Sequence, residues 1–512
     1  MLSRVHSLGL RGVEGYPVMV ELDLANGLPG FTTVGLPDSA VRESRERVTS
    51  AVRNSGFKFP ARRITVNLAP AQARKQGTHF DLPIALAVLS ASGQLGDGRR
   101  LAGVDGKPPP RLGFVGELAL DGRLRSVAGV LAMALRAKEE GFTGVVVPAG
   151  NVREAAAAGV QAYAADTLRE VVDFINGGEL ACPRLSGRCV HRAKAIEELA
   201  DVKGQALAKR ALEIAAAGGH NLLLIGPPGA GKSMLAKCLT GLLPTLSWGE
   251  ALEATRVHAA CGRRGLIGER PFRAPHHSAS TVSLIGGGPG SRPGEASLAH
   301  GGVLFLDELA EFSRGALEAL RQPLEEHKVM VTRAREALEY PARFQLVAAT
   351  NPCPCGWRGH PKKACLCSRP AVSRYLARLS GPLLDRIDIH VEMPALDFRD
   401  WARAPGAVET SAQVRARVGA ARQRQRRRLG REDFAVNAYM TAADLRRHCA
   451  LDAEGLELLE RATAAGLSAR ALDRCLRVAR TIADLEAAEG VGARHLGEAV
   501  QLRGLERLQR LC

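Results

Sequence analysis

One glycine-rich segment combines residue types that together can bind a nucleotide. Residues 222–225, LLLI, predict a buried strand, and the next eight residues fit the pattern G-x-x-x-x-G-K-[ST]. In such a loop, glycines let backbone N–H groups turn inward around phosphate, and the following helix directs its positive end toward the anion. We therefore predict that the phosphates of ATP are bound by Gly226, Pro227, Pro228, Gly229, Ala230, Gly231, Lys232 and Ser233. Lys232 is expected to contact the β- and γ-phosphates, and the Ser233 hydroxyl to hold Mg²⁺.

Two other apolar stretches end in polar residues that could complete this site. Residues 303–306, VLFL, precede Asp307 and Glu308, and residues 343–350, RFQLVAAT, precede Asn351. Ligands bind at the carboxyl ends of parallel strands, so these polar residues are expected to meet at one edge of a sheet. Asp307 would then hold the Mg²⁺ shell and Glu308 would polarise the attacking water. The three strand ends together predict ATP hydrolysis rather than storage of the nucleotide.

Four of the 11 cysteines are close together in the sequence: Cys353, Cys355, Cys365 and Cys367. Thiolates in two near pairs can complete a tetrahedral site for Zn²⁺, although Cys-x-Cys is tighter than the usual spacing of zinc ligands. The alternative is four free thiols beside the nucleotide site. The other seven cysteines are scattered, which does not indicate the disulfide framework of a secreted protein.

The composition limits the class of protein. A chain of 512 residues is too long for one core, and about three domains are expected. No run approaches the roughly 20 apolar residues of a membrane span, and the first residues lack the apolar run of a secretion signal. These features predict a cytoplasmic protein without a membrane partner. The formal net charge of +17 predicts a polyanionic partner such as nucleic acid; alternatively, the arginine excess reflects a GC-rich genome.

The first 180 residues alternate between strand and helix patterns, which indicates an α+β or α/β domain. The expected elements are strands at 18–27, 63–70 and 144–150, helices at 39–57 and 81–93, and a hairpin at 113–125 around Asp121-Gly122. The periodicity of this region does not indicate a function.

Four segments together carry a resemblance to a known family. They are PGFTTVGLPDSAVRESRERV (29–48), the run from 60 to 89 ending in FDLPIALAVL, NPCPCGWRGHPKKACLCSRP (351–370) and SRYLARLSGPLLDRIDIHVEMP (373–394). The chain resembles the ComM-like branch of the magnesium-chelatase-like AAA+ ATPases over nearly its whole length. The resemblance implies an α/β fold: an AAA+ P-loop module, a parallel sheet with helices, that carries a helical lid and follows a Lon-protease-like α+β domain.

The Lon-like domain is expected to lack protease activity. Lon-type proteolysis needs a serine nucleophile and a lysine that activates it. The segment 75–81, KQGTHFD, has no serine where Lon carries it, and the partner segment 124–135 has no lysine.

The resemblance divides the chain into five parts. They are the Lon-like domain at 1–180, a polar linker at 181–196, the ATPase core at 197–395, a basic connecting segment at 396–433 and the helical lid at 434–512.

Two insertions in the core resemble those of the magnesium-chelatase and MCM-helicase branch. Residues 248–302 are too long and glycine-rich for a plain connection and match a helix-2 insert. Residues 320–344 predict a helix and then a hairpin that pairs 328–333 with 337–341. In the related proteins this hairpin projects into a central pore, so the candidates for gripping a phosphate backbone are Lys328, Arg333 and Arg335. The alternative is a solvated basic hairpin.

The resemblance also implies roles for single residues. Asn351 matches the polar residue that orients the attacking water. Arg386 matches an arginine presented to the γ-phosphate of the neighbouring subunit, although it could instead belong to a local ion-pair cluster, and Arg378 is its nearest competitor. Arg470 matches the lid arginine that reaches the γ-phosphate, and Arg474 could exchange with it.

Three further segments have weaker assignments. The turn at 201–205, DVKGQ, matches one near the adenine in the family or is an ordinary helix cap. The arginine run ARQRQRRRLGRED, which ends at Asp433, is a solvated helix face or part of a DNA path. The pair His276-His277 is assigned to the structure of the insert.

The resemblance implies a hexameric ring that uses ATP to translocate on DNA. The expected activity is that of a helicase promoting branch migration in homologous recombination and natural transformation, with single-stranded or branched DNA as the partner. The alternative is a chelatase-type or chaperone-type motor that remodels a protein.

Overall fold

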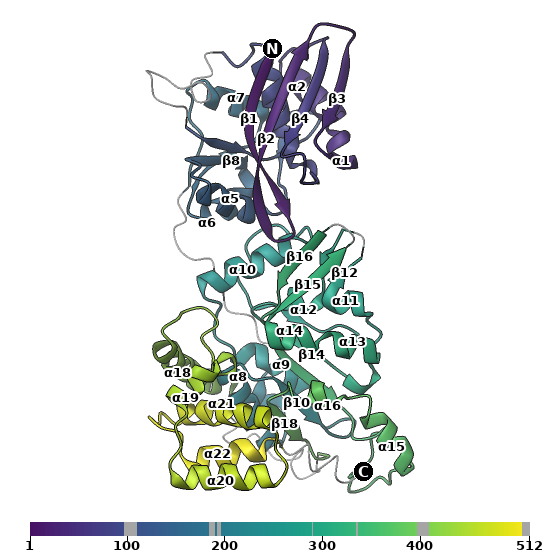
Figure 1. Cartoon of the computed structure of the whole chain (residues 1–512), viewed down its shortest axis with the longest axis vertical. Coiled ribbons are helices and arrows are strands. Elements are labelled where there is room, and N and C mark those ends of the chain that lie inside the picture. Colours follow the sequence, from purple (N-terminus) through teal and green to yellow (C-terminus); the bar gives the residue numbers. More distant parts are fainter. Residues whose placement is uncertain are drawn as a thin grey trace. The chain divides into compact units, whose positions relative to one another are not determined.

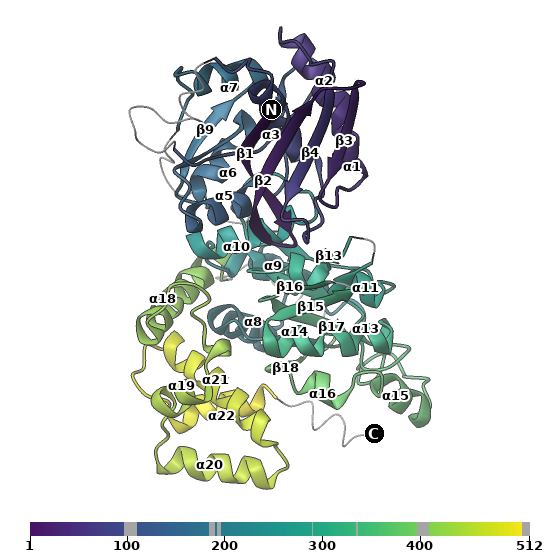
Figure 2. The ribbon, with the colours of Figure 1, turned by 45° about the horizontal axis from the view of Figure 1, so that its top comes forward.

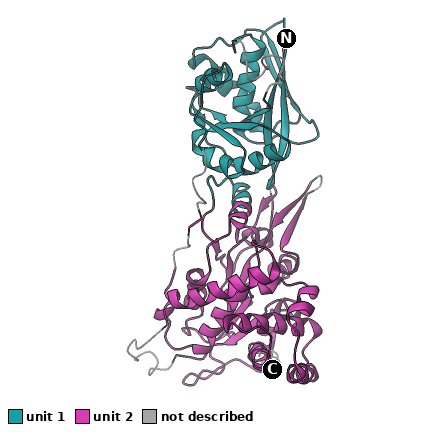
Figure 3. Ribbon diagram, turned by 90° about the vertical axis from the view of Figure 1, so that its left-hand side faces the viewer, with its two compact units in different colours: residues 1–189, 254–267 teal, residues 190–253, 268–512 magenta. Residues whose placement is uncertain are grey.

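The computed structural model describes residues 1–96, 110–183, 190–191, 196–288, 290–333, 336–396 and 409–503 (Figure 1, Figure 2). The chain forms two compact units (Figure 3). The first contains residues 1–189 and 254–267, and the second contains residues 190–253 and 268–512.

The first unit contains two sheets and a buried helix. One sheet has the order β1-β2-β4-β3, in which only β3 and β4 pair in parallel, and the other is the parallel sheet β5-β8-β9. Helix α3 (Asp81–Ala91) packs against β1 and β2, and its apolar sequence is buried nearly all round. The remaining elements are β1 (Leu2–Arg11), β2 (Glu14–Ala25), β3 (Gly30–Val34), α1 (Ser39–Arg42), α2 (Ser44–Asn54), β4 (Arg63–Ala69), β5 (Leu112–Phe114), β6 (Glu117–Leu118), β7 (Leu124–Arg125), α5 (Val130–Glu139), β8 (Gly144–Pro148), α6 (Val152–Ala157), β9 (Gln161–Ala165) and α7 (Leu168–Ile175).

The elements expected in this region are present. The predicted strands correspond to β2, β4 and β8, the helices to α1, α2 and α3, and the hairpin turn at Asp121-Gly122 connects the antiparallel pair β6 and β7. The predicted hairpin was too long, because its first residues form β5, which pairs in parallel with β8.

Residues 254–267 belong to the first unit, although the sequence placed them within the insert of the ATPase core. They include the end of α10 (Trp248–Ala259). Arg256 Nε donates to the carbonyl oxygen of Val13 at 2.9 Å, and the backbone N–H of Ile267 donates to Thr255 Oγ1 at 2.8 Å. The contact of Arg256 with Val13 joins residues far apart in sequence, so a hydrophobic pattern could not reveal it.

A five-stranded parallel sheet lies at the centre of the second unit, in the order β11-β14-β17-β10-β18. Strands β10 (Leu222–Ile225), β14 (Val303–Leu306) and β17 (Gln345–Thr350) are buried along their whole length, which explains their uninterrupted apolar sequences. The outer strands are β11 (Phe272–Arg273) and β18 (Ile389–Glu392), and the helices that pack on the sheet include α8 (Ala206–Gly218) and α9 (Lys232–Leu242).

The insert and the hairpin contact one another. Strand β15 (Lys328–Arg333) pairs antiparallel with β16 (Glu336–Pro341), which begins one residue before the predicted strand. The buried Tyr340 of β16 donates from its hydroxyl to the carbonyl oxygen of Ser291 in the insert at 2.6 Å. This region also contains α11 (Thr281–Ile285), β12 (Gly286–Gly287), β13 (Arg292–Pro293), α12 (Glu295–Leu298), α13 (Arg314–Ala319), α14 (Arg321–Glu326), α15 (Arg369–Leu376) and α16 (Gly381–Leu384).

The C-terminal part is helical, as expected. Its helices are α18 (Ser411–Leu429), α19 (Ala442–His448), α20 (Ala453–Ala464), α21 (Ala469–Leu485) and α22 (Ala493–Gln501). The fold class predicted from the sequence, an α/β module with a helical lid after an α+β domain, is therefore confirmed.

Three arginines of the run contact other helices of the unit, which corrects the expectation of a solvated face or DNA path for these residues. Arg422 donates to the carbonyl oxygen of Ala216 in α8, and Arg424 donates to that of Asp484 in α21. Arg428 pairs with the buried carboxylate of Asp484 at 2.7 Å. The first residues of the connecting segment, 397–408, lie outside the described residues.

Across the described residues, every helix is too short or too polar to cross a lipid bilayer.

Candidate nucleotide site

The sheet brings the three predicted strand ends together. Strands β14, β17 and β10 are neighbours, and parallel pairing aligns Ile225 with Thr350 and Leu306 with Ala348. The residues that follow these strands therefore lie side by side at the carboxyl edge, where ligands bind in parallel sheets.

The loop after β10 has the backbone that a phosphate site requires. Gly229 and Gly231 have φ values of +79° and +88°, which L-residues with a side chain rarely adopt. Gly226 is needed for a different reason, because a Cβ atom there would collide with the carbonyl oxygen of Met393 beyond β18. Helix α9 begins at Lys232 without a side-chain cap, so no capping side chain competes with a phosphate for its first N–H groups.

Lys232 connects the loop to Asn351. Its Nζ donates to the carbonyl oxygens of Gly226 at 2.7 Å and Pro227 at 3.0 Å and to Asn351 Oδ1 at 3.0 Å. Burial lowers the pKa of Lys232, whereas the charges of Asp307 and Glu308 oppose that change. Because its three acceptors are uncharged oxygens, the ammonium group can attract the charge of a phosphate.

Ser233 and Asp307 offer the oxygen ligands that Mg²⁺ prefers. Ser233 Oγ donates to Asp307 Oδ2 at 2.6 Å, and the backbone N–H of Glu308 donates to Asp307 Oδ1 at 2.9 Å, which fixes the carboxylate. A hydroxyl beside a carboxylate on the phosphate side of the loop fits a Mg²⁺ ion carried by a nucleotide.

Glu308 has an unusual backbone and a partner that the sequence analysis missed. Its φ of +52° is left-handed, which costs ~1–3 kcal/mol for a residue with a side chain. Its carboxylate is 53% exposed, and Oε2 lies 2.9 Å from Nδ1 of His277. The sequence pattern indicates only that His277 belongs to the insert. The position of His277 shortly after β11 could have indicated this contact. Strand β11 pairs in parallel with β14, and Glu308 lies just beyond the end of β14.

Arg386 lies at the opposite edge of the sheet from the phosphate loop. Asn221, which precedes β10, donates from Nδ2 to the carbonyl oxygen of Arg386 at 3.0 Å and from its backbone N–H to Asp388 at 2.9 Å. The guanidinium of Arg386 is buried and paired with Glu325. Arg386 therefore forms a local ion pair, as one interpretation from the sequence expected, and it lies away from the phosphate loop of its own chain.

The lid arginines lie near the same edge. Arg474 donates to Asp388 Oδ1 at 2.6 Å, and it holds the pKa of Asp388 well below its usual range against the opposing effect of burial. The hydrogen bond from Arg386 lowers the pKa of Glu325, and the charges of Arg386, Arg470 and Arg474 lower it further. Arg470 is exposed, and it is among the arginines whose charge lowers the pKa of Glu325.

Other predicted residues lie elsewhere. Arg378 donates to the carbonyl oxygen of Ala310 and pairs with Glu311 at 3.0 Å. Gln205 of the predicted adenine turn donates to the carbonyl oxygens of Pro394 at 2.8 Å and of Ala230 in the phosphate loop at 3.4 Å.

Only one of the three hairpin candidates has a described side chain. Lys328 pairs with Glu339 at 2.9 Å, and both side chains are exposed. Arg335 and the side chain of Arg333 lie outside the described residues.

The four clustered cysteines begin two residues after Asn351. Their sulfur atoms all lie within 4.8 Å of one another.

Three family models match the chain. Residues 198–401 match magnesium chelatase, subunit ChlI, residues 20–151 match subunit ChlI of Mg-chelatase, and residues 408–503 match the C-terminal model of subunit ChlI. These matches define the class as magnesium-chelatase-like AAA+ ATPases.

Full-length relatives narrow the assignment. The chain is 46% identical to competence protein ComM of Haemophilus influenzae, with 99% of this chain and 98% of that protein covered. It is 44% identical to YifB of Escherichia coli, over 99% of this chain and 98% of that protein. A protein of Mycobacterium tuberculosis is also 44% identical, over 98% of each chain. The chain belongs to the ComM family of magnesium-chelatase-like AAA+ ATPases.

Glu308→Gln is expected to bind ATP but to lower its turnover by about 10²–10⁴-fold, because the amide cannot accept a proton from the attacking water. Phosphate release measures turnover, and a fluorescent ATP analogue measures binding. Glu311→Gln is the matched control, since Glu311 pairs with Arg378 and is expected to leave turnover unchanged. Normal turnover in Glu308→Gln would remove Glu308 from the reaction.

His277→Ala is expected to raise the basal ATP turnover by about 1.5- to fivefold, because an exposed pair of this kind is worth ~0.2–1 kcal/mol and its loss frees the Glu308 carboxylate. Steady-state phosphate release without DNA is the measurement, and the neighbouring His276→Ala is the control. A fall in turnover would show instead that His277 holds Glu308 in its working position.

Proposed function

We propose that this protein is an ATP-dependent DNA translocase that works as a hexameric ring and promotes branch migration in homologous recombination, including natural transformation. One observation carries the motor part of the proposal. Lys232, Asp307 and Asn351 are at the carboxyl edge of the sheet, whereas Arg386, with Arg470 and Arg474 near it, is at the amino edge. Such a subunit offers a nucleotide site on one side and the arginines for a neighbour's site on the other, which favours a closed ring.

The residues of this chain have separate tasks in the proposed reaction. The phosphate loop and the start of α9 bind the phosphates, Lys232 neutralises their charge, and Asn351 and Glu308 orient and polarise water. A bound Mg²⁺ would draw electron density from the phosphate oxygens, and Ser233 and Asp307 would hold it. Arg386 of a neighbouring subunit would stabilise the charge that develops on the γ-phosphate. The proposed cofactors are ATP and Mg²⁺, with a structural Zn²⁺ at the four cysteines.

DNA is the proposed partner, and the cytoplasm is the proposed location. The name of the Haemophilus influenzae relative, competence protein ComM, supports a role in DNA uptake or integration. The net charge of +17 and the basic residues of the hairpin favour a polyanion. The second candidate is a chelatase-type or chaperone-type motor acting on a protein, because all three family models describe a magnesium chelatase subunit.

Three-stranded DNA with a labelled displaced strand tests the partner. We expect purified protein and ATP to move the branch point, and this DNA to raise ATP turnover several-fold over that of the protein alone. Lys232→Ala is the control, and it should abolish both effects because the phosphate loop loses its cation. If no DNA structure raises turnover and a protein partner does, the DNA translocase proposal is wrong.

Arg386→Ala is expected to lower ATP turnover by about 10³-fold, the scale of an arginine contributed to phosphoryl transfer. Mixing it with Glu308→Gln subunits should restore part of the activity, because an Arg386→Ala site beside a Glu308→Gln subunit then receives an arginine from that neighbour. Phosphate release across a series of mixing ratios measures this rescue. The exposed Arg427→Ala on α18 is the matched control. Failure to rescue would place the role of Arg386 within its own subunit.

A further inference from the structure

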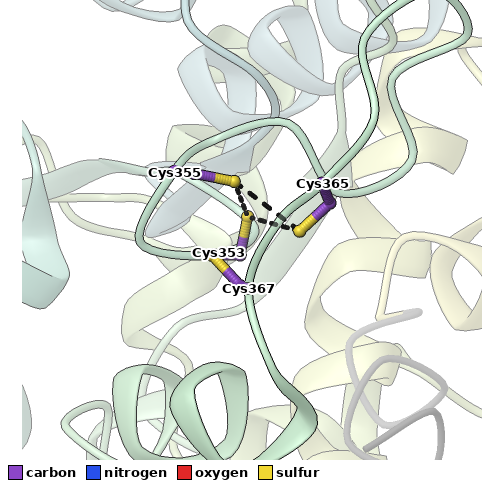
Figure 4. A group of neighbouring side chains, drawn as sticks. All are labelled: Cys353, Cys355, Cys365 and Cys367. Atoms are coloured by element: carbon purple, nitrogen blue, oxygen red, sulfur yellow. Dashed lines mark hydrogen bonds between the residues drawn. The ribbon is translucent and has the colours of Figure 1, made fainter.

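The four sulfur atoms are arranged at the dimensions of a zinc site. Cys353 Sγ lies 3.4 Å from Cys355 Sγ and 3.6 Å from Cys365 Sγ, and the latter two are 3.6 Å apart (Figure 4). All four sulfurs, including that of Cys367, fall within 4.8 Å of one another. Four thiolates around Zn²⁺ at ~2.3 Å form a tetrahedron with edges of about 3.8 Å, which agrees with these distances.

The segment that carries the cysteines has no regular secondary structure and little apolar burial to stabilise it. Between β17 and α15, residues 351–368 contain no helix or strand, and a loop of this length is uncommon in a compact domain. Within it only Pro352, Cys353 and Gly356 are buried, and Leu366 is 91% exposed. Because apolar burial is so small, a metal ion that crosslinks both ends of the loop would supply the missing stabilisation.

The cysteine loop has a basic sequence, which is compatible with an anionic zinc–thiolate site. Zn²⁺ with four thiolates carries a net charge of about −2, which favours cations nearby. The loop between the cysteine pairs contains Arg358, Lys362 and Lys363, and the Lys363 ammonium lies 3.9 Å from the centre of the Trp357 ring.

The cysteine loop also contacts the nucleotide site. Cys353 follows Asn351 by two residues, and Asn351 accepts the hydrogen bond from Lys232. Gly356 has a φ of +79°, and a Cβ atom there would lie 2.6 Å from Cδ of Pro228 in the phosphate loop. The backbone of the cysteine loop therefore packs directly against the loop that is proposed to bind phosphate.

We propose that Cys353, Cys355, Cys365 and Cys367 bind one Zn²⁺ ion, and that this ion holds Asn351 and the phosphate loop in the arrangement that binds ATP. The site is structural, with all four positions taken by protein ligands. Its effect on ATP rests on the proposed nucleotide site, whereas zinc binding itself does not. Loss of the metal would release the loop, and both Asn351 and Pro228 would lose their fixed neighbour.

The test compares the full-length protein with the double variant Cys365→Ser/Cys367→Ser, and uses Cys182→Ser as the matched control because Cys182 is an exposed free cysteine. Elemental analysis of the purified proteins is expected to find about one zinc per chain in the wild type and in Cys182→Ser, and none in the double variant. Affinity for a fluorescent ATP analogue is expected to fall at least tenfold in the double variant.

A second arm avoids the risk that the double variant does not fold. The wild-type protein is treated with a chelator, its ATP affinity is measured, and Zn²⁺ is added back; we expect a loss and then a recovery. Wild-type protein that lacks zinc and does not take it up, or whose cysteines are joined as disulfides by mass spectrometry, would overturn the metal site. Full zinc content with unchanged ATP affinity after its removal would overturn the link to the phosphate loop. If the wild type holds zinc but binds no ATP, the proposed function fails while the metal site stands.

Discussion

Parallel pairing of β14, β17 and β10 is the constraint on which the rest of the second unit depends. These buried strands run in the same direction, so the residues that follow them reach the same edge, where Lys232 contacts Asn351 and Ser233 contacts Asp307. The same geometry places the residues that precede the strands, including Asn221 and the nearby Arg386, at the other edge. The length of the strands therefore separates two sets of charged residues, and the proposed assembly of subunits would bring them together.

The parts of this architecture that follow from local chemistry could be read from the sequence. The phosphate loop, the acidic strand end and the hairpin depend on residue types at short spacing, and each lies where it was expected, apart from the one residue by which β16 begins earlier. The parts that depend on tertiary contacts could not. Residues 254–267 join the first unit through hydrogen bonds such as that from Arg256 to Val13, and His277 meets Glu308 only because two strands are neighbours.

The cysteines and arginines show why residue type alone is an incomplete guide. Cys-x-Cys spacing argued weakly for a metal, yet the fold of the loop brings the sulfurs to within 4.8 Å of one another. The arginine run suggested an exposed surface, yet Arg428 forms an ion pair with the buried Asp484, and Arg422 donates a hydrogen bond to a backbone carbonyl oxygen. The partners of these arginines are distant in sequence, and only the folded chain shows them.

The internal use of arginines on α18 changes how the net charge of the protein should be interpreted. Binding to a nucleic acid releases about 0.7–0.9 counterions for each phosphate that a cation neutralises, and this sets the dependence of affinity on ionic strength. Arg422, Arg424 and Arg428 are held by carbonyl and carboxylate oxygens, so they are not free to displace counterions. The sensitivity of the proposed DNA binding to salt should therefore report a smaller number of cations than the formal charge of +17 suggests.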